Sequence, residues 1–337
     1  MPSGTWRRSW SSLPAMARAL SPDRRCPSMV ARCPAAEPSD THVKGEAAMR
    51  DLTNKTAVIT GAASGLGLAM ARAFCEEGMR VVLADLQGPA LAEAERALGA
   101  EGFEVLAVAV DVADAASVQR LAQRAVEHFG GVDVLVNNAG IAGDLPRESW
   151  QHDLANWRRV LDVNLLGAVH GIHSFVPLLL EQAAGGHIVN TASMGGLMAL
   201  PYLAPYAAAK SALVALSESL DIELKALGAN VGVSVLCPGM VQTGLTQAGR
   251  DHAACTAVAP SAPAEAFYRN SQKAAQQATV TAQFVAQQVI EGIRANSFYI
   301  LTHEGAFDLA KSRWLRLSTH PPEYTESDHE PQYRHQR

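Results

Sequence analysis

A tyrosine and a lysine one helical turn apart are the residues of this sequence best suited to proton transfer. Tyr206 precedes Lys210 by four residues, so on a helix the two side chains lie on one face. A phenol has a reference pKa of about 10, and a neighbouring ammonium favours the phenolate. Ser193, at the end of an apolar run upstream, adds a hydroxyl that can hold a substrate oxygen. Because an ordinary surface helix can carry the same pair, other motifs must decide.

A glycine-rich turn joins an apolar run to a helical pattern earlier in the chain. The segment TGAASGLG begins at Thr60, which is also the last residue of the apolar run TAVIT. Its glycines permit a tight turn, backbone approach to a pyrophosphate and close helix packing, while the helix N-terminal amides offer an anion site. The expected contacts are Gly61, Ser64, Gly65, Leu66 and Gly67. The alternatives are a simple glycine turn and the similar turn of methyltransferases.

Two acidic residues end the next two predicted strands. Asp85 lies eighteen residues beyond Gly67, where a carboxylate can accept hydrogen bonds from the adenosine ribose hydroxyls. The same charge would repel a 2′-phosphate, so this position favours NAD(H) over NADP(H). Asp111 and Val112 at the following strand end are candidates for contact with the adenine, although aspartates at such places are often helix caps.

Apolar strands and helical patterns alternate from residue 55 onwards. We expect strands at 56–60, 80–84, 103–110, 132–136, 186–191, 231–236 and 297–301. We expect helices at 66–77, 88–98, 115–129, 156–181 and 205–227. Strict alternation implies right-handed crossovers and a parallel sheet covered on both faces. The fold class is therefore α/β, with a single Rossmann-type doubly wound parallel sheet.

We expect one catalytic domain over residues 51–310. Residues 1–50 are rich in Arg, Ser and Pro and are predicted to be a disordered extension. A targeting leader and a start-site artefact before Met49 are the alternatives. Residues 311–337 form a polar tail, and an Ala/Gln-rich insert at 244–277 is expected to be a mobile substrate lid.

Composition excludes several other classes of protein. The net charge of −5 indicates neither a nucleic-acid nor an anionic-membrane partner, and no apolar run suggests a membrane span. Five cysteines without a C-x-x-C pair argue against a disulfide framework and a zinc site, and favour a reducing, cytoplasmic location. No histidine has metal-ligand spacing with a cysteine or carboxylate, so no metal is expected.

Taken together, these motifs resemble the short-chain dehydrogenase/reductase family. TGAASGLG, NNAG, an asparagine in the following helix, Ser193, Y-x-x-x-K and PG-x-x-x-T occur in the family's order over about residues 52–302. The three-residue gap between Gly61 and Gly65 is similar to that of the compact, single-domain branch. The resemblance implies a homodimer or homotetramer, formed through the long helices at 156–181 and 205–227.

The resemblance also implies a catalytic tetrad of Asn164, Ser193, Tyr206 and Lys210. Tyr206 would be the general acid/base, and Ser193 would hydrogen-bond the substrate oxygen. Lys210 would bind the nicotinamide ribose and lower the pKa of Tyr206, while Asn164 would hold a water in a proton relay. Further cofactor contacts would be Asn138, Ala139 and Gly140 on the adenosine side, and Pro238, Gly239, Val241 and Thr243 near the nicotinamide.

The expected substrate pocket is mainly apolar. Its candidate walls are Ile141, Leu145, Met194, Leu197, Tyr202, Met240 and Val241. Since no arginine is placed to grip an anion, we expect an uncharged hydrophobic secondary alcohol or ketone, either alicyclic, steroid-like or terpenoid. A catalytically silent sensor or scaffold is the main alternative, and the intact tetrad argues against it. A methyltransferase would leave the Tyr/Lys pair without a purpose.

Overall fold

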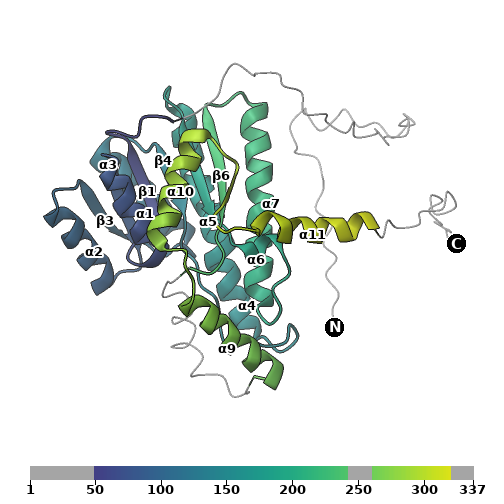
Figure 1. Ribbon diagram of the computed structural model, residues 1–337. Coiled ribbons are helices and arrows are strands. Elements are labelled where there is room, and N and C mark those ends of the chain that lie inside the picture. The colour runs from purple at the N-terminus through teal and green to yellow at the C-terminus, as the bar shows by residue number, and fades with distance from the viewer. Residues whose placement is uncertain (1–48, 242–259, 320–337) are drawn as a thin grey trace, which may run out of the picture. The chain divides into compact units, whose positions relative to one another are not determined.

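The computed structural model describes residues 49–241 and 260–319 (Figure 1). The predicted N-terminal extension, Thr243, the insert up to residue 259 and the tail beyond residue 319 lie outside these described residues. The sheet, the helices and the candidate site all belong to the two described ranges.

Seven parallel strands form one sheet in the order β3-β2-β1-β4-β5-β6-β7. They are β1 (Thr56–Thr60), β2 (Arg80–Asp85), β3 (Val105–Ala109), β4 (Val134–Asn137), β5 (Gly186–Thr191), β6 (Val231–Cys237) and β7 (Tyr299–Leu301). The order reverses between β1 and β4, and in open parallel sheets ligands bind at such a switch point. The predicted Rossmann-type sheet is confirmed.

Helices cover both faces of this sheet (Figure 1). One face carries α1 (Gly65–Glu76), α2 (Pro89–Ala100) and α10 (Ala282–Ala295). The other carries α3 (Ala115–Phe129), α5 (Gly167–Glu181) and α7 (Ala204–Ala226). The remaining helices are α4 (Leu154–Leu161), α6 (Met194–Leu197), α9 (Ala262–Gln276) and α11 (Ala306–Thr319).

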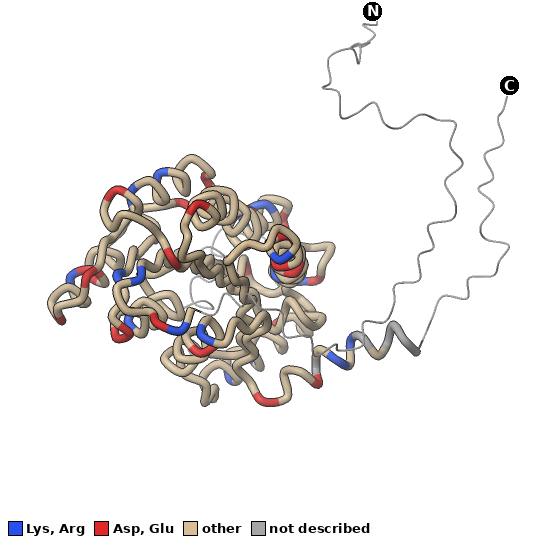
Figure 2. The backbone as a smooth tube through the Cα atoms, turned by 90° about the horizontal axis from the view of Figure 1, so that it is seen from above, with Lys and Arg blue, Asp and Glu red and all other residues tan. Residues whose placement is uncertain are grey.

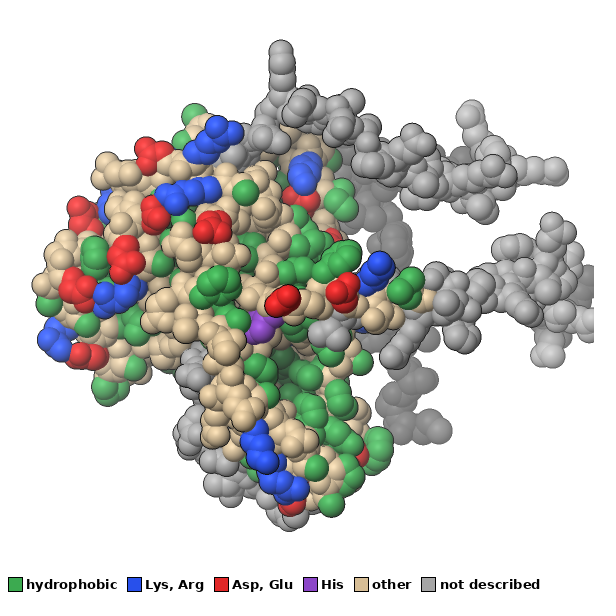
Figure 3. Space-filling view, in the orientation of Figure 1, with side chains coloured by type: hydrophobic (Ala, Val, Ile, Leu, Met, Phe, Trp, Pro, Cys, Tyr) green, Lys and Arg blue, Asp and Glu red, His purple; other side chains and the backbone are tan. Residues whose placement is uncertain are grey.

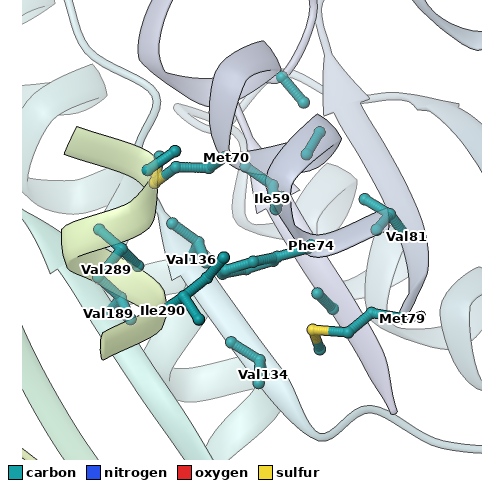
Figure 4. Close-up of a cluster of buried hydrophobic side chains, with 14 of the residues drawn as sticks. Ile59, Met70, Phe74, Met79, Val81, Val134, Val136, Val189, Val289 and Ile290 are labelled. Carbon is teal, nitrogen blue, oxygen red and sulfur yellow. The ribbon is translucent and has the colours of Figure 1, made fainter. Parts of the chain in front are cut away.

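Helix α10 was not expected, although it completes one core. It begins after Thr281, whose side chain accepts a hydrogen bond from the Phe284 amide, and it packs beside α1. Figure 4 shows Phe74 of α1 lying between Ile290 of α10 and the strand residue Val136. Phe74 is fully buried, and burial of a side chain of this size contributes about 1.5–3 kcal/mol.

Two other predictions differ from the structure. Part of the insert described as weakly patterned is the regular helix α9, which Ser261 caps through a hydrogen bond from the Ala264 amide. The expected domain boundary at residue 310 falls inside α11, whose first turn contains Asp308. In α9, alanine and glutamine form a helix without a strong apolar stripe, which is why the sequence pattern did not reveal it.

The predicted helix 156–181 is interrupted by a π-helical turn, η2 (Asp162–Leu166), between α4 and α5. Over Leu154–Glu181 this is one helix of 28 residues, which by length and composition passes as a membrane span, contrary to the expectation from the sequence. Soluble core helices pass the same test. Here Phe175 and Leu179 are buried in the core between α3 and the sheet, which explains the apolar residues.

Acidic and basic side chains are interspersed around the described chain (Figure 2). Several form local pairs, such as Arg72 with Glu101 at 2.7 Å and Lys225 with Asp221 at 2.8 Å. Exposed pairs of this kind contribute only about 0–1 kcal/mol each, so they are not the main source of stability.

Candidate active site

Tyr206 and Lys210 lie in the first two turns of α7, beside the carboxyl end of β5. Both are buried, with exposures of 9% and 3%. The Lys210 ammonium donates a hydrogen bond to the Thr191 carbonyl at 2.6 Å, and its Nζ lies 5.9 Å from the centre of the Tyr206 ring. The two side chains therefore share one helix face, and the end of β5 fixes the position of the lysine.

Burial controls the protonation of this pair. It raises the pKa of Tyr206 above its ordinary value, against the opposing effect of a hydrogen bond with Ser193. It lowers the pKa of Lys210 to about 8. For Tyr206 the net direction is opposite to the predicted one, because loss of hydration outweighs the other influences on the phenol.

Ser193 borders the same space as the phenol. It caps α6, where its Oγ accepts a hydrogen bond from the Gly195 amide at 3.0 Å. A Cβ atom placed on Gly195 would lie 3.5 Å from the Tyr206 ring and 3.6 Å from the Ser193 Oγ. The serine hydroxyl and the tyrosine ring are thus neighbours across one glycine, and one substrate oxygen can meet both.

Asn164 sits in the π-helical turn and is 1% exposed. Its Oδ1 accepts from the Ile141 amide at 2.7 Å, and its Nδ2 donates to the Ile141 carbonyl at 2.8 Å. A Cβ on Gly140 would lie 3.4 Å from both the Asn164 Oδ1 and the Lys210 Nζ, which shows how close these groups are. Because the side-chain amide holds the loop after β4, the predicted relay water would have to be bound by the backbone of the π-helical turn. Single π-helical turns within α-helices are common at functional sites.

The glycine-rich turn has the geometry that a pyrophosphate requires. Gly61 and Gly65 have φ values of +68° and +54°, a region that disfavours other residues. A Cβ on Gly67 would lie 2.0 Å from the Gly61 carbonyl oxygen, so only glycine fits. Ser64 caps α1 without a side-chain hydrogen bond, and Leu66 follows it in the first helical turn. These residues fit a dinucleotide phosphate at the N-terminus of α1.

Asp85 ends β2 directly beneath this turn. Its two carboxylate oxygens accept hydrogen bonds from the amides of Ala63 and Leu86, both at 2.8 Å. The carboxylate therefore ties the turn to the strand and leaves lone pairs for a ribose hydroxyl. Asp111 instead accepts from the Ala113 amide at 3.0 Å in a local turn, while Asp114 is the residue that caps α3. Val112 is buried at 8% exposure.

The residues after β4 are held by Thr60, which the sequence did not single out. The Thr60 Oγ1 accepts from the amides of Asn138 and Ala139 at 2.9 and 3.1 Å. The Asn138 side chain donates back to the Thr60 carbonyl at 2.9 Å. Asn138 and Ala139 thus have a structural role in joining β1 to β4. A threonine at the end of a strand before a glycine turn is the signal that would have revealed this role.

His303, missed from the sequence, holds the segment after β6. Its Nδ1 accepts a hydrogen bond from the Gly239 amide at 3.1 Å. Its Nε2 therefore bears the proton and donates to the Met240 carbonyl at 3.0 Å. The Pro238 carbonyl accepts from the Met194 amide at 2.9 Å, which joins this segment to α6. Sixty-four residues separate Gly239 from His303, so local spacing gives no indication of the contact.

The predicted substrate walls lie at different depths. Ile141 packs against Tyr206, whereas Leu197 packs into the core between α7 and β6. Met194 and Val241 are buried, Leu145 and Tyr202 are half-buried, and Met240 is exposed. Figure 3 shows hydrophobic side chains gathered where the surface is hollowed beside α9.

One residue of this region was unexpected. Arg147 is 4% exposed, and its backbone amide donates to the Tyr202 carbonyl at 3.0 Å. A buried cation therefore lies in the loop that holds a predicted wall residue, although the sequence indicated no arginine placed near the pocket.

Comparison with known proteins establishes the family. The family model described as short chain dehydrogenase matches residues 55–254, more than half of the chain. The chain is a short-chain dehydrogenase/reductase. The predicted resemblance is confirmed, and the protein is an oxidoreductase of this family.

Relatives of this dehydrogenase/reductase match most of its length. The 1-deoxy-11-beta-hydroxypentalenate dehydrogenase of Streptomyces avermitilis is 39% identical over 76% of this chain and 87% of the relative. The CLA biosynthesis dehydrogenase/reductase of Lactiplantibacillus plantarum is 33% identical over 80% of this chain and 96% of the relative. A solved short-chain dehydrogenase/reductase from Burkholderia phymatum, in complex with NAD, has 38% identity and a TM-score of 0.76, covering 82% of this chain and 99% of that chain.

Proposed function

We propose that this dehydrogenase/reductase uses NAD to interconvert a hydrophobic secondary alcohol and the corresponding ketone. The observation that carries the proposal is the meeting of Ser193, Tyr206 and Lys210 at the carboxyl end of β5, with Asn164 and Lys210 both close to Gly140. A silent sensor or scaffold has no need of this buried set of polar side chains, so the intact tetrad argues against that alternative.

The residues of the switch point fit NAD. Gly61 and Gly65 would accept the pyrophosphate at the N-terminus of α1, and Asp85 would accept hydrogen bonds from the adenosine ribose. The Asp85 carboxylate supports NAD over NADP because it would repel a 2′-phosphate. When bound, NAD takes a hydride from an alcohol, and its reduced form returns a hydride to a ketone. The NAD complex of the Burkholderia phymatum relative supports the same cofactor.

The chain itself supplies orientation and proton transfer. In alcohol oxidation, Ser193 Oγ would hydrogen-bond the substrate oxygen, and Tyr206, after losing its own proton to become a phenolate, would receive the hydroxyl proton at Oη as the carbon loses its hydride. In ketone reduction, the same Oη returns the proton to the developing alkoxide. Lys210, whose pKa is lowered to about 8, can exchange a proton close to neutral pH and so restore the state of the site after each turnover.

Apolar walls support a hydrophobic substrate. Ile141 and Met194 lie next to Tyr206 and Ser193, and the hydroxypentalenate relative acts on a substrate that its name describes as a hydroxylated acid. An uncharged alicyclic, steroid-like or terpenoid alcohol is our first candidate. A hydrophobic hydroxy acid is the second candidate, by analogy with the name of that relative's substrate.

We also propose a homo-oligomer in a reducing, cytoplasmic setting. Leu166 in η2, Leu180 in α5 and Ile222 in α7 expose apolar surface, at 40%, 45% and 67%, which a helix–helix interface would cover. Cys75 and Cys237 are free and buried, in line with thiols that stay reduced.

A substrate panel with NAD and NADP side by side tests the reaction. We expect the wild type to form NADH with apolar secondary alcohols, and Tyr206→Phe to lower the rate by about 10²–10⁴-fold, since general acid–base catalysis contributes this much. Tyr299→Phe is the matched control, because that tyrosine lies on β7 and its hydroxyl bonds Glu218. Equal rates for the wild type and Tyr206→Phe would refute the assigned role.

A further inference from the structure

A bulky residue near the candidate site holds a backbone conformation that normally belongs to glycine. Tyr202 has φ +63°, four residues before Tyr206. The other two described non-glycine residues with positive φ are Asn54 and Asn296, and asparagine tolerates this region. Strain of this kind persists only where surrounding contacts impose it, and it is concentrated at functional sites.

Two hydrogen bonds from the loop before α4 impose the conformation of Tyr202. Its carbonyl oxygen accepts from the Arg147 amide at 3.0 Å and is 3.2 Å from the Nε2 of His152. Because the carbonyl can only accept, this nitrogen bears the imidazole proton. His152 is 7% exposed, and its burial lowers its pKa, which keeps the imidazole neutral in this arrangement.

The strained backbone places the Tyr202 ring against α9. Its centre lies 5.5 Å from that of Phe267, with the two planes tilted by 50°, within the range of favourable aromatic pairs. The loop before α4 holds α9 at a second point, because the Ser261 hydroxyl that caps α9 donates to the Glu148 carboxylate. Helix α9 is therefore fixed at two points beside the loops that flank Tyr206.

The position of this aromatic pair relates it to the substrate. Leu200 and Leu203, which flank Tyr202 in sequence, pack against the buried cluster of Val160, Tyr206 and Ala209. Hydrophobic side chains also gather in the hollowed surface beside α9 (Figure 3). The ring pair thus joins α9 to the loop whose leucines pack on the cluster that contains Tyr206.

We propose that Tyr202 and Phe267 are specificity-determining residues that limit the size of the alcohol admitted to Tyr206. This inference rests on the proposed function, since it concerns the same site. Removal of either ring enlarges the approach, so kcat/KM for bulky alcohols rises relative to kcat/KM for small ones. Because the rings act as one contact, removal of both adds little to the removal of one.

The test compares cyclopentanol with cyclododecanol in Phe267→Ala, Tyr202→Gly and the double variant. Glycine is chosen at position 202 because it adopts a φ of +63° without strain, so the variant loses the ring and still folds. We expect the kcat/KM ratio of cyclododecanol to cyclopentanol to rise by about tenfold in each single variant, the scale on which apolar pockets discriminate. Phe284→Ala is the control, because Phe284 is a 47% exposed phenylalanine on α10.

A calorimetric titration of the same proteins with both alcohols separates this inference from the proposed function. A ratio of affinities that shifts towards cyclododecanol supports the size limit, whether or not the alcohol is turned over. Turnover by none of the proteins would count against the proposed reaction alone. Ratios of affinity and of kcat/KM in Phe267→Ala that stay within twofold of the wild type would overturn the inference.

Discussion

The substitution Asp85→Asn tests the proposed preference for NAD over NADP at the residue expected to contact the adenosine ribose. Both carboxylate oxygens accept backbone amides at 2.8 Å, from Ala63 and Leu86. An asparagine has only one acceptor oxygen, so its hydrogen bonds with the ribose hydroxyls would also be weaker. A hydrogen bond to a charged group contributes about 1.5–3 kcal/mol, which corresponds to a weakening of NAD binding by about tenfold or more.

The same substitution removes a repulsion that NADP would experience. Two unit charges 4 Å apart interact by about 1 kcal/mol in water, so a doubly charged 2′-phosphate gains about 2 kcal/mol when the carboxylate is lost. Together, the two effects shift the difference in binding free energy between the cofactors by about 3 kcal/mol or more in favour of NADP. The ratio of the NADP to the NAD dissociation constant should therefore fall roughly 100-fold.

Isothermal titration calorimetry of each cofactor measures this ratio directly. Asp111→Asn is the matched control, because Asp111 follows β3 as Asp85 ends β2, and its predicted contact is with the adenine that both cofactors share. It should change the two affinities equally. An Asp85→Asn protein that keeps the wild-type ratio would show that Asp85 does not set the preference.

Two further predictions concern stability. Burial lowers the pKa of His187 to about 4 from 6.5, so on acidification the unfolded chain binds a proton before the folded chain does. The free energy of unfolding should therefore fall between pH 6.5 and about 4, by up to about 3 kcal/mol, in urea titrations. A His187→Gln protein with an equally steep decline would contradict this. Ser217 accepts a hydrogen bond from the buried Asn190 side chain at 2.9 Å, so Ser217→Ala should cost about 1–3 kcal/mol in the same assay. Ser219→Ala removes a similar but exposed hydroxyl and should change stability by less than about 0.5 kcal/mol; equal losses would show that the buried bond contributes nothing.

Much of the fold follows from local pattern. The runs at Thr56–Thr60 and Gly186–Thr191 are apolar and short, and the structure places buried strands at these residues. Helix α10 shows the limit of such reasoning, because Val285, Val289 and Ile293 have helical spacing but follow a long polar insert. Their position against α1 becomes evident only when the sheet brings the two helices together.

The candidate site divides in the same way. The spacing of Tyr206 and Lys210 and the order of the glycines are properties of the chain, and in combination with the other motifs they predicted the family and its reaction class. Contacts between distant segments cannot be derived from local spacing. For this reason the hydrogen bond between His303 and the Gly239 amide and the Tyr202–Phe267 pair were found only in the structure. The direction of the Tyr206 pKa shift also depends on the fold, because desolvation arises from burial by neighbours that sequence spacing does not specify.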